Sequence, residues 1–349
     1  MENLNYHDKT NIKNSIRLKE LQTTLPRFSK DYFRGIEPNT SSRTRLAYAY
    51  DLRTFFEFLN QTNPELKNTD IADYKIEILD LIEPVDIEEY LDYLTYYESD
   101  NLTRINKERG KSRKLSALKS FYNYYYQKQL IKTNPASFIS APKLYEKDIV
   151  RLDVDEVAKL LDAVESGDNM TARQKTYHNK TKKRDLAIMT LLLGTGIRVS
   201  ECVGLDLNHI NFENNGMKII RKGGNEVVIY FGDEVQEALY DYIQEREKMI
   251  PASGHENAFF LSLQMKRLST RSIENLVKKY SSSTIKLKKI TPHKLRSTYG
   301  TSLYRETGDI YLVADVLGHK DVNTTKKHYA AIEEDRRISA AKMVKLRKE

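Results

Sequence analysis

The sequence predicts a mainly α-helical protein with a small antiparallel β-sheet, organised in two domains. Apolar residues recur at steps of three and four along most of the chain, and this spacing gives a helix one apolar face. Only one pair of segments combines extended, β-favouring residues with glycines between them, as a β-hairpin requires. The length of 349 residues favours two domains over a single compact unit.

Residues 1–145 are expected to form a helical domain. Residues 1–25 are interpreted as a helix or a tail. The first clear helix follows a possible N-cap at Asn39 or Thr40, and a second begins near Pro84 and Asp86. The third is expected between Leu102 and Lys132. Their apolar stripes are Leu46, Tyr50, Phe55, Phe56 and Leu59; Ile87, Tyr90, Leu91 and Leu94; and Leu115, Leu118, Phe121, Tyr122 and Tyr125.

The third helix is strongly basic away from its apolar side, and Glu108 is its only acid. Such a run is usually a solvated face. On a helix this rich in aromatic residues, contact with the phosphate backbone of DNA is an equally good interpretation. The candidate DNA-binding residues are Arg113, Lys114 and Lys119.

Residues 146–349 are expected to form the second domain. Residues 141–153 lack periodicity and are interpreted as the linker. Asp153 to Glu156 predicts a helix start, and the polar, basic segment 170–183 is predicted to be an exposed loop. The predicted strands are Met217–Arg221 and Glu226–Phe231, joined across glycines that permit a tight turn.

The charge balance favours a polyanionic partner without requiring one. Lys and Arg outnumber Asp and Glu by 57 to 49, which gives a formal net charge of +8 and an isoelectric point near 9.1. The start of the chain has no apolar signal segment, and the longest apolar stretch is too short to span a bilayer. Cys202 is the sole cysteine and has apolar neighbours. We therefore expect a soluble, cytoplasmic protein with a buried, inert thiol.

Two basic residues occupy turns. Arg198 follows Gly196, which ends an apolar helix, and precedes a new helix start at Val199. An arginine at such a junction is more often an ion-pairing structural residue. Lys222 stands at the mouth of the predicted hairpin beside two glycines, where a surface lysine is the ordinary interpretation. Neither residue identifies a function by itself.

A more specific pattern follows Thr291, which is a suitable N-cap before Pro292 at the first helical position. A spacing of three places His293 and Arg296 on one face of that helix. Backbone amides, an imidazole and a guanidinium would then surround the positive helix end, a natural site for an oxyanion or a phosphate. A metal site is not expected, because no Cys, Asp or Glu stands at ligand spacing from this histidine.

A second histidine and a tyrosine follow the basic residues described above. Gly318 predicts a helix stop before His319, and Asn323 to Thr325 predict the start of a helix that carries Tyr329. A lone tyrosine on a helix is usually a core or surface residue. The whole set nevertheless offers a hydroxyl nucleophile, cations for the oxygens of a pentavalent phosphate, and a proton donor for the leaving oxygen.

In order and spacing, these motifs resemble the tyrosine recombinase and integrase family. The matching segments are GTGIRVSE around Arg198, RKGG at Lys222, HKLR with His293 and Arg296, LGH ending at His319, and the terminal Tyr329. The arrangement is similar to that of the single-recombinase XerS branch of the Xer proteins. The resemblance implies a helical core-site-binding domain followed by a catalytic domain.

The resemblance also implies a role for each residue. Arg198 and Arg296 would hold the non-bridging oxygens of the scissile phosphate. His293 and His319 would hydrogen-bond the phosphate and assist proton transfer. Lys222 would protonate the 5′ leaving oxygen.

Tyr329 would be the nucleophile and would form a 3′-phosphotyrosine bond. It lies ten positions after His319, one more than in many members of the family, so His328 serves as a control. The segment after Tyr329 has the spacing of a helix, which would dock on a neighbouring protomer or on its own domain. Its apolar residues are Ile332, Ile338, Ala341 and Val344.

The implied partners are a double-stranded DNA recombination site and three further copies of the chain, forming a homotetramer that works through a Holliday junction. No cofactor, metal, membrane or small-molecule substrate is implied. The implied role is chromosome dimer resolution, and an integrase or resolvase of a mobile element is the alternative. A type IB topoisomerase would share the chemistry without a partner site. A non-catalytic DNA-binding protein would share only the basic surface.

Overall fold

The computed structural model divides the chain into two compact units, Met1–Glu146 and Lys147–Glu349. Both units are mainly helical and carry small antiparallel sheets, so the predicted fold class is confirmed. Among the described residues, none of the helices combines the length and the hydrophobicity of a membrane-spanning segment. The residues that the structure describes are 4–99, 102–144, 150–168, 170–221, 224–285, 288–319 and 322.

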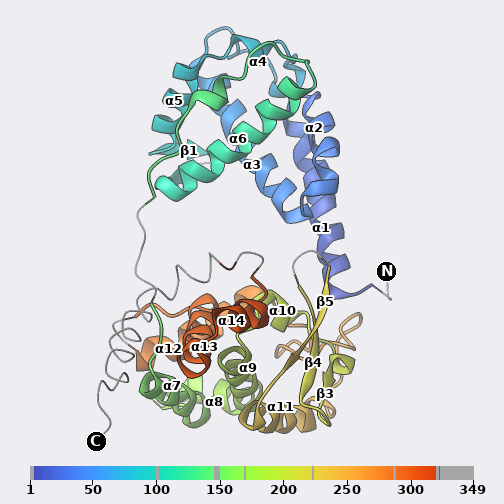
Figure 1. The fold of residues 1–349 in the computed structure, drawn as a ribbon. Helices are drawn as coiled ribbons and strands as arrows, with labels where there is room; N and C mark the ends of the chain where they lie inside the picture. The colour runs from blue at the N-terminus through green and yellow to red at the C-terminus, as the bar shows by residue number, and fades with distance from the viewer. Residues whose placement is uncertain are drawn as a thin grey trace, which may run out of the picture. The chain divides into compact units, whose positions relative to one another are not determined.

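The first unit is built from six helices and a two-stranded sheet within its described ranges, with short 3-10 turns between them (Figure 1). The elements are α1 (Tyr6–Leu21), α2 (Ser29–Gly35), α3 (Ser42–Thr62), α4 (Ile78–Leu81), α5 (Pro84–Tyr93), β1 (Tyr97–Ser99), β2 (Leu102–Arg104) and α6 (Glu108–Gln127).

Aromatic rings from α3, α5 and α6 fill the core of this unit. Phe56 and Phe121 lie edge to face, 6.0 Å apart between ring centroids, and Phe55 meets Tyr90 in the same way at 5.1 Å. All four side chains are buried, so the predicted stripes do face the core. Tyr50 is an exception, because it is exposed and its hydroxyl accepts a hydrogen bond from Arg17 at the surface.

Two predicted helix limits in this unit are wrong. Leu102–Arg104 is a strand paired with Tyr97–Ser99, and α6 begins only at Glu108 and ends at Gln127, before Lys132. Leu102 is exposed, so the apolar periodicity that marks the helix does not extend back to it. The N-cap of α3 is Ser41, whose hydroxyl accepts the Thr44 amide at 3.1 Å, in place of Asn39 or Thr40.

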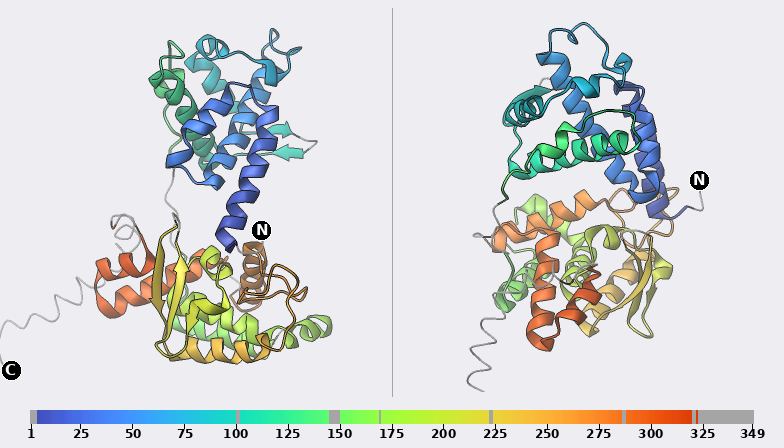
Figure 2. Two further views of the ribbon diagram at one scale, coloured as in Figure 1. Left: turned by 90° about the vertical axis from the view of Figure 1, so that its right-hand side faces the viewer. Right: turned by 45° about the horizontal axis from the view of Figure 1, so that its top comes forward.

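The second unit arranges its helices around α9, which contacts α7, α11 and α13. Figure 2 shows the long β4–β5 hairpin standing beside this group of helices. The elements are α7 (Val154–Ser166), α8 (Ala172–Asn179), α9 (Lys182–Thr195), α10 (Val199–Val203), β3 (Ile210–Asn211), β4 (Gly216–Ile220), β5 (Glu226–Tyr230), α11 (Asp233–Arg246), α12 (Thr270–Thr284), α13 (Pro292–Thr307) and α14 (Ile310–Leu317).

Helix α9 is central because it is apolar around its axis beyond the charged first turn: Ala187, Ile188, Met189, Leu191 and Leu192 are all fully buried. It ends at Gly196, whose φ of 62° is in the left-handed region that favours glycine. Helix α10 follows and carries Cys202. That thiol is fully buried, and burial raises its pKa.

The predicted start of α7 is confirmed. The Asp153 carboxylate accepts the Glu156 amide at 2.8 Å, and the Glu156 carboxylate accepts the Asp153 amide at 2.9 Å, which is a capping box. The predicted loop at 170–183 is wrong, since it contains α8 and the first two residues of α9. Helix α8 has no apolar stripe and buries only His178, so apolar periodicity gave no sign of it.

The predicted hairpin is confirmed to within one residue at each strand end. Strand β4 pairs antiparallel with β5, with Ile220 opposite Glu226, and β3 adds a short third strand. Beyond the paired strands, the Arg221 amide donates to the Asn225 carbonyl at 2.8 Å. The Gly224 amide donates back to the Arg221 carbonyl at 3.0 Å, and Gly224 has a φ of 88°. Arg221 therefore closes the hairpin.

Candidate active site

Arg198 is held by a buried carboxylate. It is the N-cap of α10, where its amide donates to Glu201 Oε2 at 2.7 Å and its guanidinium donates to Glu201 Oε1 at 2.8 Å. Glu201 is 3% exposed, whereas the Arg198 side chain is 33% exposed. A second donor of the guanidinium reaches the Gly318 carbonyl at 3.2 Å. The guanidinium is therefore fixed from the protein side, and part of it faces solvent.

Arg296 is placed one turn into α13 and is buried. Its Nη1 donates to the Gly196 carbonyl at 2.6 Å, and its Nη2 donates to the Leu317 carbonyl. A side chain on Gly196 would meet Tyr299 Cδ1 at 2.4 Å, so this close approach requires glycine. Arg296 thus joins the end of α9 to the end of α14.

The two arginines therefore donate to consecutive carbonyls, those of Leu317 and Gly318. Helix α14 ends there, with Gly318 in the left-handed conformation at a φ of 62°. His319 comes next, and its amide donates back to the Ala314 carbonyl at 2.9 Å. The structure consequently brings Arg198, Arg296 and the backbone of His319 to one helix end, although they are far apart in the sequence.

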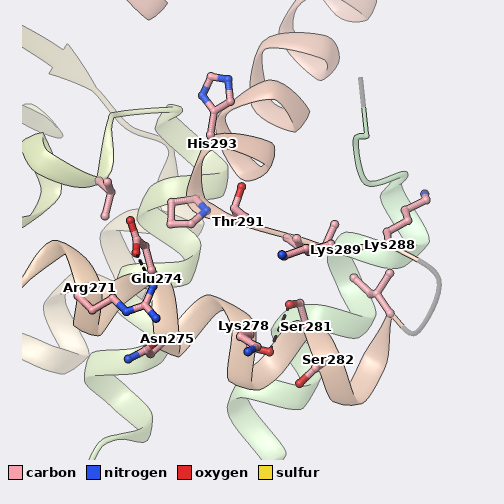
Figure 3. Close-up of a pocket in the computed structure, with 14 residues that line it drawn as sticks. Arg271, Glu274, Asn275, Lys278, Ser281, Ser282, Lys288, Lys289, Thr291 and His293 are labelled. Carbon is pink, nitrogen blue, oxygen red and sulfur yellow. Dashed lines mark hydrogen bonds and ion pairs between the residues drawn. The ribbon is translucent and has the colours of Figure 1, made fainter. Parts of the chain in front are cut away.

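His293 lies in the first turn of α13, after the predicted N-cap Thr291 and first helical residue Pro292, and it is exposed. It lines a pocket of about 970 Å³ formed by α12, the start of α10 and the segment that leads into α13. Figure 3 shows His293 at the start of its helix and basic side chains around the pocket. The basic residues of the lining are Arg271, Lys278, Lys288 and Lys289.

The four basic side chains of the pocket differ in their ion pairs and in their exposure. Arg271 pairs with Glu274 at 3.2 Å, and Lys288 donates to Glu156 Oε2 at 2.5 Å. Lys278 and Lys289 are exposed. Nine of the fourteen lining residues carry a hydrogen-bond donor or a positive charge, so the pocket can accept an anionic ligand. No three His, Cys, Asp or Glu side chains are grouped as metal ligands in the part of the chain that the structure describes.

Two predicted catalytic residues, Lys222 and Tyr329, lie outside the described residues. The same holds for His328, for the expected N-cap at 323–325 and for the apolar residues after Tyr329. Their assigned roles stay predictions.

The three DNA-binding candidates on α6 have different surroundings. Arg113 has a half-exposed side chain that pairs with Asp51 of α3, and Lys119 is partly exposed. Lys114 does not lie on an exposed basic face as expected. It is 6% exposed, and its ammonium donates to Asp51 Oδ1 and Thr54 Oγ1, both at 3.2 Å. Burial raises the pKa of Asp51, and the two cations oppose that rise. Lys114 therefore partners a buried carboxylate within the unit.

The sequence did not single out two residues of this site. Glu201 could have been suspected, because it stands three positions after Arg198 at a helix start, the spacing of an ion pair. Arg221 gave no such signal. Its guanidinium donates to the carbonyls of Asp315 at 3.2 Å and Val316 at 2.8 Å, more than ninety residues away in the sequence.

Comparison with known proteins gives a consistent result. Residues 150–336 match the model of the phage integrase family. Tyrosine recombinase XerC of Caldanaerobacter subterraneus subsp. tengcongensis is 34% identical over 303 residues, which cover 85% of this chain and 80% of the relative. Tyrosine recombinase XerS of Streptococcus uberis is 29% identical over 353 residues, which cover 94% of this chain and 98% of the relative.

Solved structures share the fold. The XerH site-specific recombinase bound to palindromic difH substrate, in its post-cleavage complex, aligns with a TM-score of 0.64 at 21% identity, covering 87% of this chain and 81% of that one. The Tn1549 transposon integrase in complex with circular intermediate DNA aligns with a TM-score of 0.60 at 22% identity, covering 85% of this chain and 93% of that one.

Proposed function

Because the chain belongs to the phage integrase family and is an Xer-like, site-specific tyrosine recombinase, we propose that Tyr329 is its nucleophile and that the end of α14 frames its phosphate site. The observation that carries this proposal is the convergence of Arg198 and Arg296 on neighbouring carbonyls beside His319. Two guanidinium groups held in place before substrate arrives supply preorganised charge for a phosphate whose negative charge grows during the reaction.

The reaction is a transfer of one phosphoryl group. The Tyr329 oxygen attacks the scissile phosphorus, the bond from phosphorus to the 5′ oxygen breaks, and a 3′-phosphotyrosine bond forms. His293 and His319 hydrogen-bond the phosphate and assist removal of the tyrosyl proton. The released 5′ hydroxyl of another strand then attacks the phosphotyrosine and frees Tyr329. One phosphate ester bond is exchanged for another at each step, so no net input of energy is needed.

Lys222 is the proposed general acid for the 5′ leaving oxygen. It follows Arg221 directly in the sequence, at the tip of a glycine-containing hairpin from which a long side chain can extend. Neighbouring guanidinium groups disfavour the charged form of a lysine and ease release of its proton.

Strand exchange needs four active sites, two on each DNA site, so the proposed assembly is a homotetramer on two recombination sites that passes through a Holliday junction. The exposed bases Lys278 and Lys289 beside His293, with Arg113 and Lys119 of the first unit, are the proposed contacts to DNA phosphates. Chromosome dimer resolution is the proposed role, because the relatives are named XerC and XerS. A paired inverted repeat at the replication terminus would support that role, and one at the border of a mobile element would contradict it.

The test of the nucleophile is Tyr329→Phe on a nicked recombination site that traps the covalent protein–DNA product. The ring still packs while the attacking oxygen is missing, so we expect site binding within about twofold of wild type and no covalent product. His328→Gln changes the adjacent residue and is the matched control. This variant should still form the covalent product. A covalent product from Tyr329→Phe would redirect the search to Tyr280 and Tyr299. A wild-type chain that binds the site but never forms the product would be a DNA-binding protein without catalysis.

The test of the general acid replaces the bridging 5′ oxygen with sulfur, which leaves without a proton. Lys222→Ala should lower the rate of cleavage of ordinary DNA by about 100-fold or more relative to wild type. It should cleave the sulfur substrate nearly as fast as wild type. Equal impairment on both substrates would reduce Lys222 to a binding role and point to His293 or Lys294 as the acid.

A further inference from the structure

The end of α14 binds a third arginine besides the two proposed catalytic ones. Arg221 donates to the carbonyls of Asp315 and Val316, Arg296 to that of Leu317, and Arg198 to that of Gly318. Four successive carbonyls therefore accept hydrogen bonds from three guanidinium groups. The three come from separate places in the unit: the end of β4, the first turns of α13 and the N-cap of α10.

The carbonyl groups of a final helical turn lack partners within the helix and carry the negative end of the helix dipole, so cations are favoured there. Hydrogen bonds from charged donors are also shorter and stronger than those between neutral groups. Arg221 donates to two carbonyls of this turn at once, that of Val316 and that of Asp315, which also accepts the Gly318 amide at 2.8 Å. It thereby fastens the hairpin to the helix end that the other two arginines already hold.

The fit of Arg221 against this turn is close. A side chain at Gly318 would lie 2.4 Å from Arg221 Nη1 and 2.7 Å from its Nε, so the guanidinium rests directly on the glycine. Its Nε is buried and makes no hydrogen bond to any described residue. Leaving a buried donor unpaired is unfavourable. The position of Arg221 is therefore set by its two bonds to α14 and not by ordinary surface solvation.

The backbone of Arg221 is fixed as well, because its amide and its carbonyl both bond across the hairpin. One peptide bond then separates it from Lys222, which limits the distance between their Cα atoms to about 3.8 Å. We propose that Arg221 is a positioning residue: by anchoring the hairpin to the end of α14, it holds the general acid Lys222 in register with the phosphate site. This inference rests on the proposed function.

The experiment compares cleavage of the oxygen and sulfur substrates by Arg221→Gln and Arg221→Lys, with Lys218→Gln as the matched control. Lys218 is a basic residue of the same strand, but it pairs at the surface with Glu226 at 2.6 Å. The ratio of the two rates is measured on one preparation, so it does not depend on how much of a variant is folded.

For Arg221→Gln we expect the rate on ordinary DNA to fall about 10- to 100-fold, because a displaced acid loses most of its effect, and the rate on the sulfur substrate to stay within about threefold of wild type. Arg221→Lys keeps the positive charge but not the planar geometry of the guanidinium. Its rate on ordinary DNA should lie between those of wild type and Arg221→Gln. Lys218→Gln should leave both rates unchanged.

An equal loss on both substrates would overturn the inference, since Arg221 would then act through the phosphate site or the fold. No loss on ordinary DNA would overturn it as well. If Lys222→Ala is rescued by sulfur while Arg221→Gln is not, only this inference fails. If the wild-type chain forms no covalent product, the proposed function is what fails. If Lys222→Ala is not rescued, the assignment of Lys222 as the general acid fails.

Discussion

At the scale of single residues, the buried carboxylate of Glu201 holds the partly exposed guanidinium of Arg198 in place. Glu201 accepts both the amide and the guanidinium of Arg198, and it is 3% exposed. Arg271 and Glu274 form a pair with the same spacing, but there the acid is 46% exposed. Solvent screens the second pair more strongly than the first, so the same two residue types contribute differently to stability.

Glu201→Gln keeps the shape of the side chain and removes its charge. We expect it to lower the free energy of unfolding by about 1.5–3 kcal/mol, the contribution of hydrogen bonds to charged groups, and to slow cleavage because Arg198 is held less firmly. Glu274→Gln is the control and should change stability by less than about 0.5 kcal/mol. Denaturant titration of both variants measures the difference, and equal effects would contradict the assignment.

The sequence could identify the proposed catalytic residues, because their motifs are local and ordered along the chain. It could not predict that Arg198 and Arg296 meet at the end of α14, since those bonds join residues 120 and 21 positions apart. Arg221 was missed for the same reason. Its two partners are backbone carbonyls, which every residue has, and they leave no signature in the sequence.

At the scale of elements, α6 shows that a basic helix can have two kinds of basic residue. Lys114 and Arg113 both pair with Asp51, but the Lys114 side chain is buried, whereas Arg113 and Lys119 keep partial exposure. Charge alone does not separate these roles. Residues 113 and 114 are adjacent, and successive positions on a helix point about 100° apart, so one can face the core while the other faces out.

The salt dependence of DNA binding distinguishes the two kinds. Arg113→Ala and Lys119→Ala together should reduce the slope of log affinity against log salt by about 0.9 for each lost phosphate contact. Lys114→Met should leave the slope unchanged and instead lower the free energy of unfolding by about 3 kcal/mol, because it removes a partner of a buried charge. A change of slope in Lys114→Met, or none in the double variant, would contradict this assignment.

Helices α8, α9 and α12 meet at a buried polar network. The Tyr280 hydroxyl donates to Asp185 Oδ2 at 2.9 Å and lies 3.1 Å from His178 Nδ1. Arg184 donates twice to the same carboxylate. Burial lowers the pKa of His178 below its ordinary value of 6.5. Burial also lowers the pKa of His209, whose Nδ1 accepts the Asp206 amide at 3.1 Å.

These histidines predict a loss of stability in acid. Since their pKa values are lower in the folded protein, the unfolded chain takes up protons first as the pH falls below about 6.5. The stabilisation is complete above that pH and is lost below it, by about 1.4 kcal/mol per pH unit for each histidine. His178→Gln and His209→Gln should each flatten the dependence of unfolding free energy on pH between 6.5 and the lowered values. A wild-type stability that is constant there would exclude the effect.

Apolar periodicity predicted the elements that bury an apolar face, among them α3, α5, α7 and α9. It failed for α8 and for the β1–β2 pair. Helix α8 buries a histidine that belongs to a polar network, and β2 is exposed along its whole length. Hydrophobic patterns report burial, so an element that buries little apolar surface is invisible to them.

At the scale of the whole molecule, each unit has its own core. In the first, the aromatic residues of α3, α5 and α6 pack on one another, and in the second the helices surround α9. We therefore expect a fragment of residues 1–144 to unfold cooperatively when heated, as a domain with its own core does. Circular dichroism of the fragment at increasing temperature tests this. A gradual loss of signal without a transition would show that the first unit depends on the second.

The burial of Cys202 makes the protein well suited to site-directed labelling. Thiol reagents react with the thiolate, and a fully buried thiol with a raised pKa supplies almost none near neutral pH. New cysteines at exposed positions, such as Tyr126 in the first unit and Val228 in the second, should therefore be labelled without removing the natural one. A pair of fluorophores attached there would report by energy transfer how the distance between the two units changes when DNA is added.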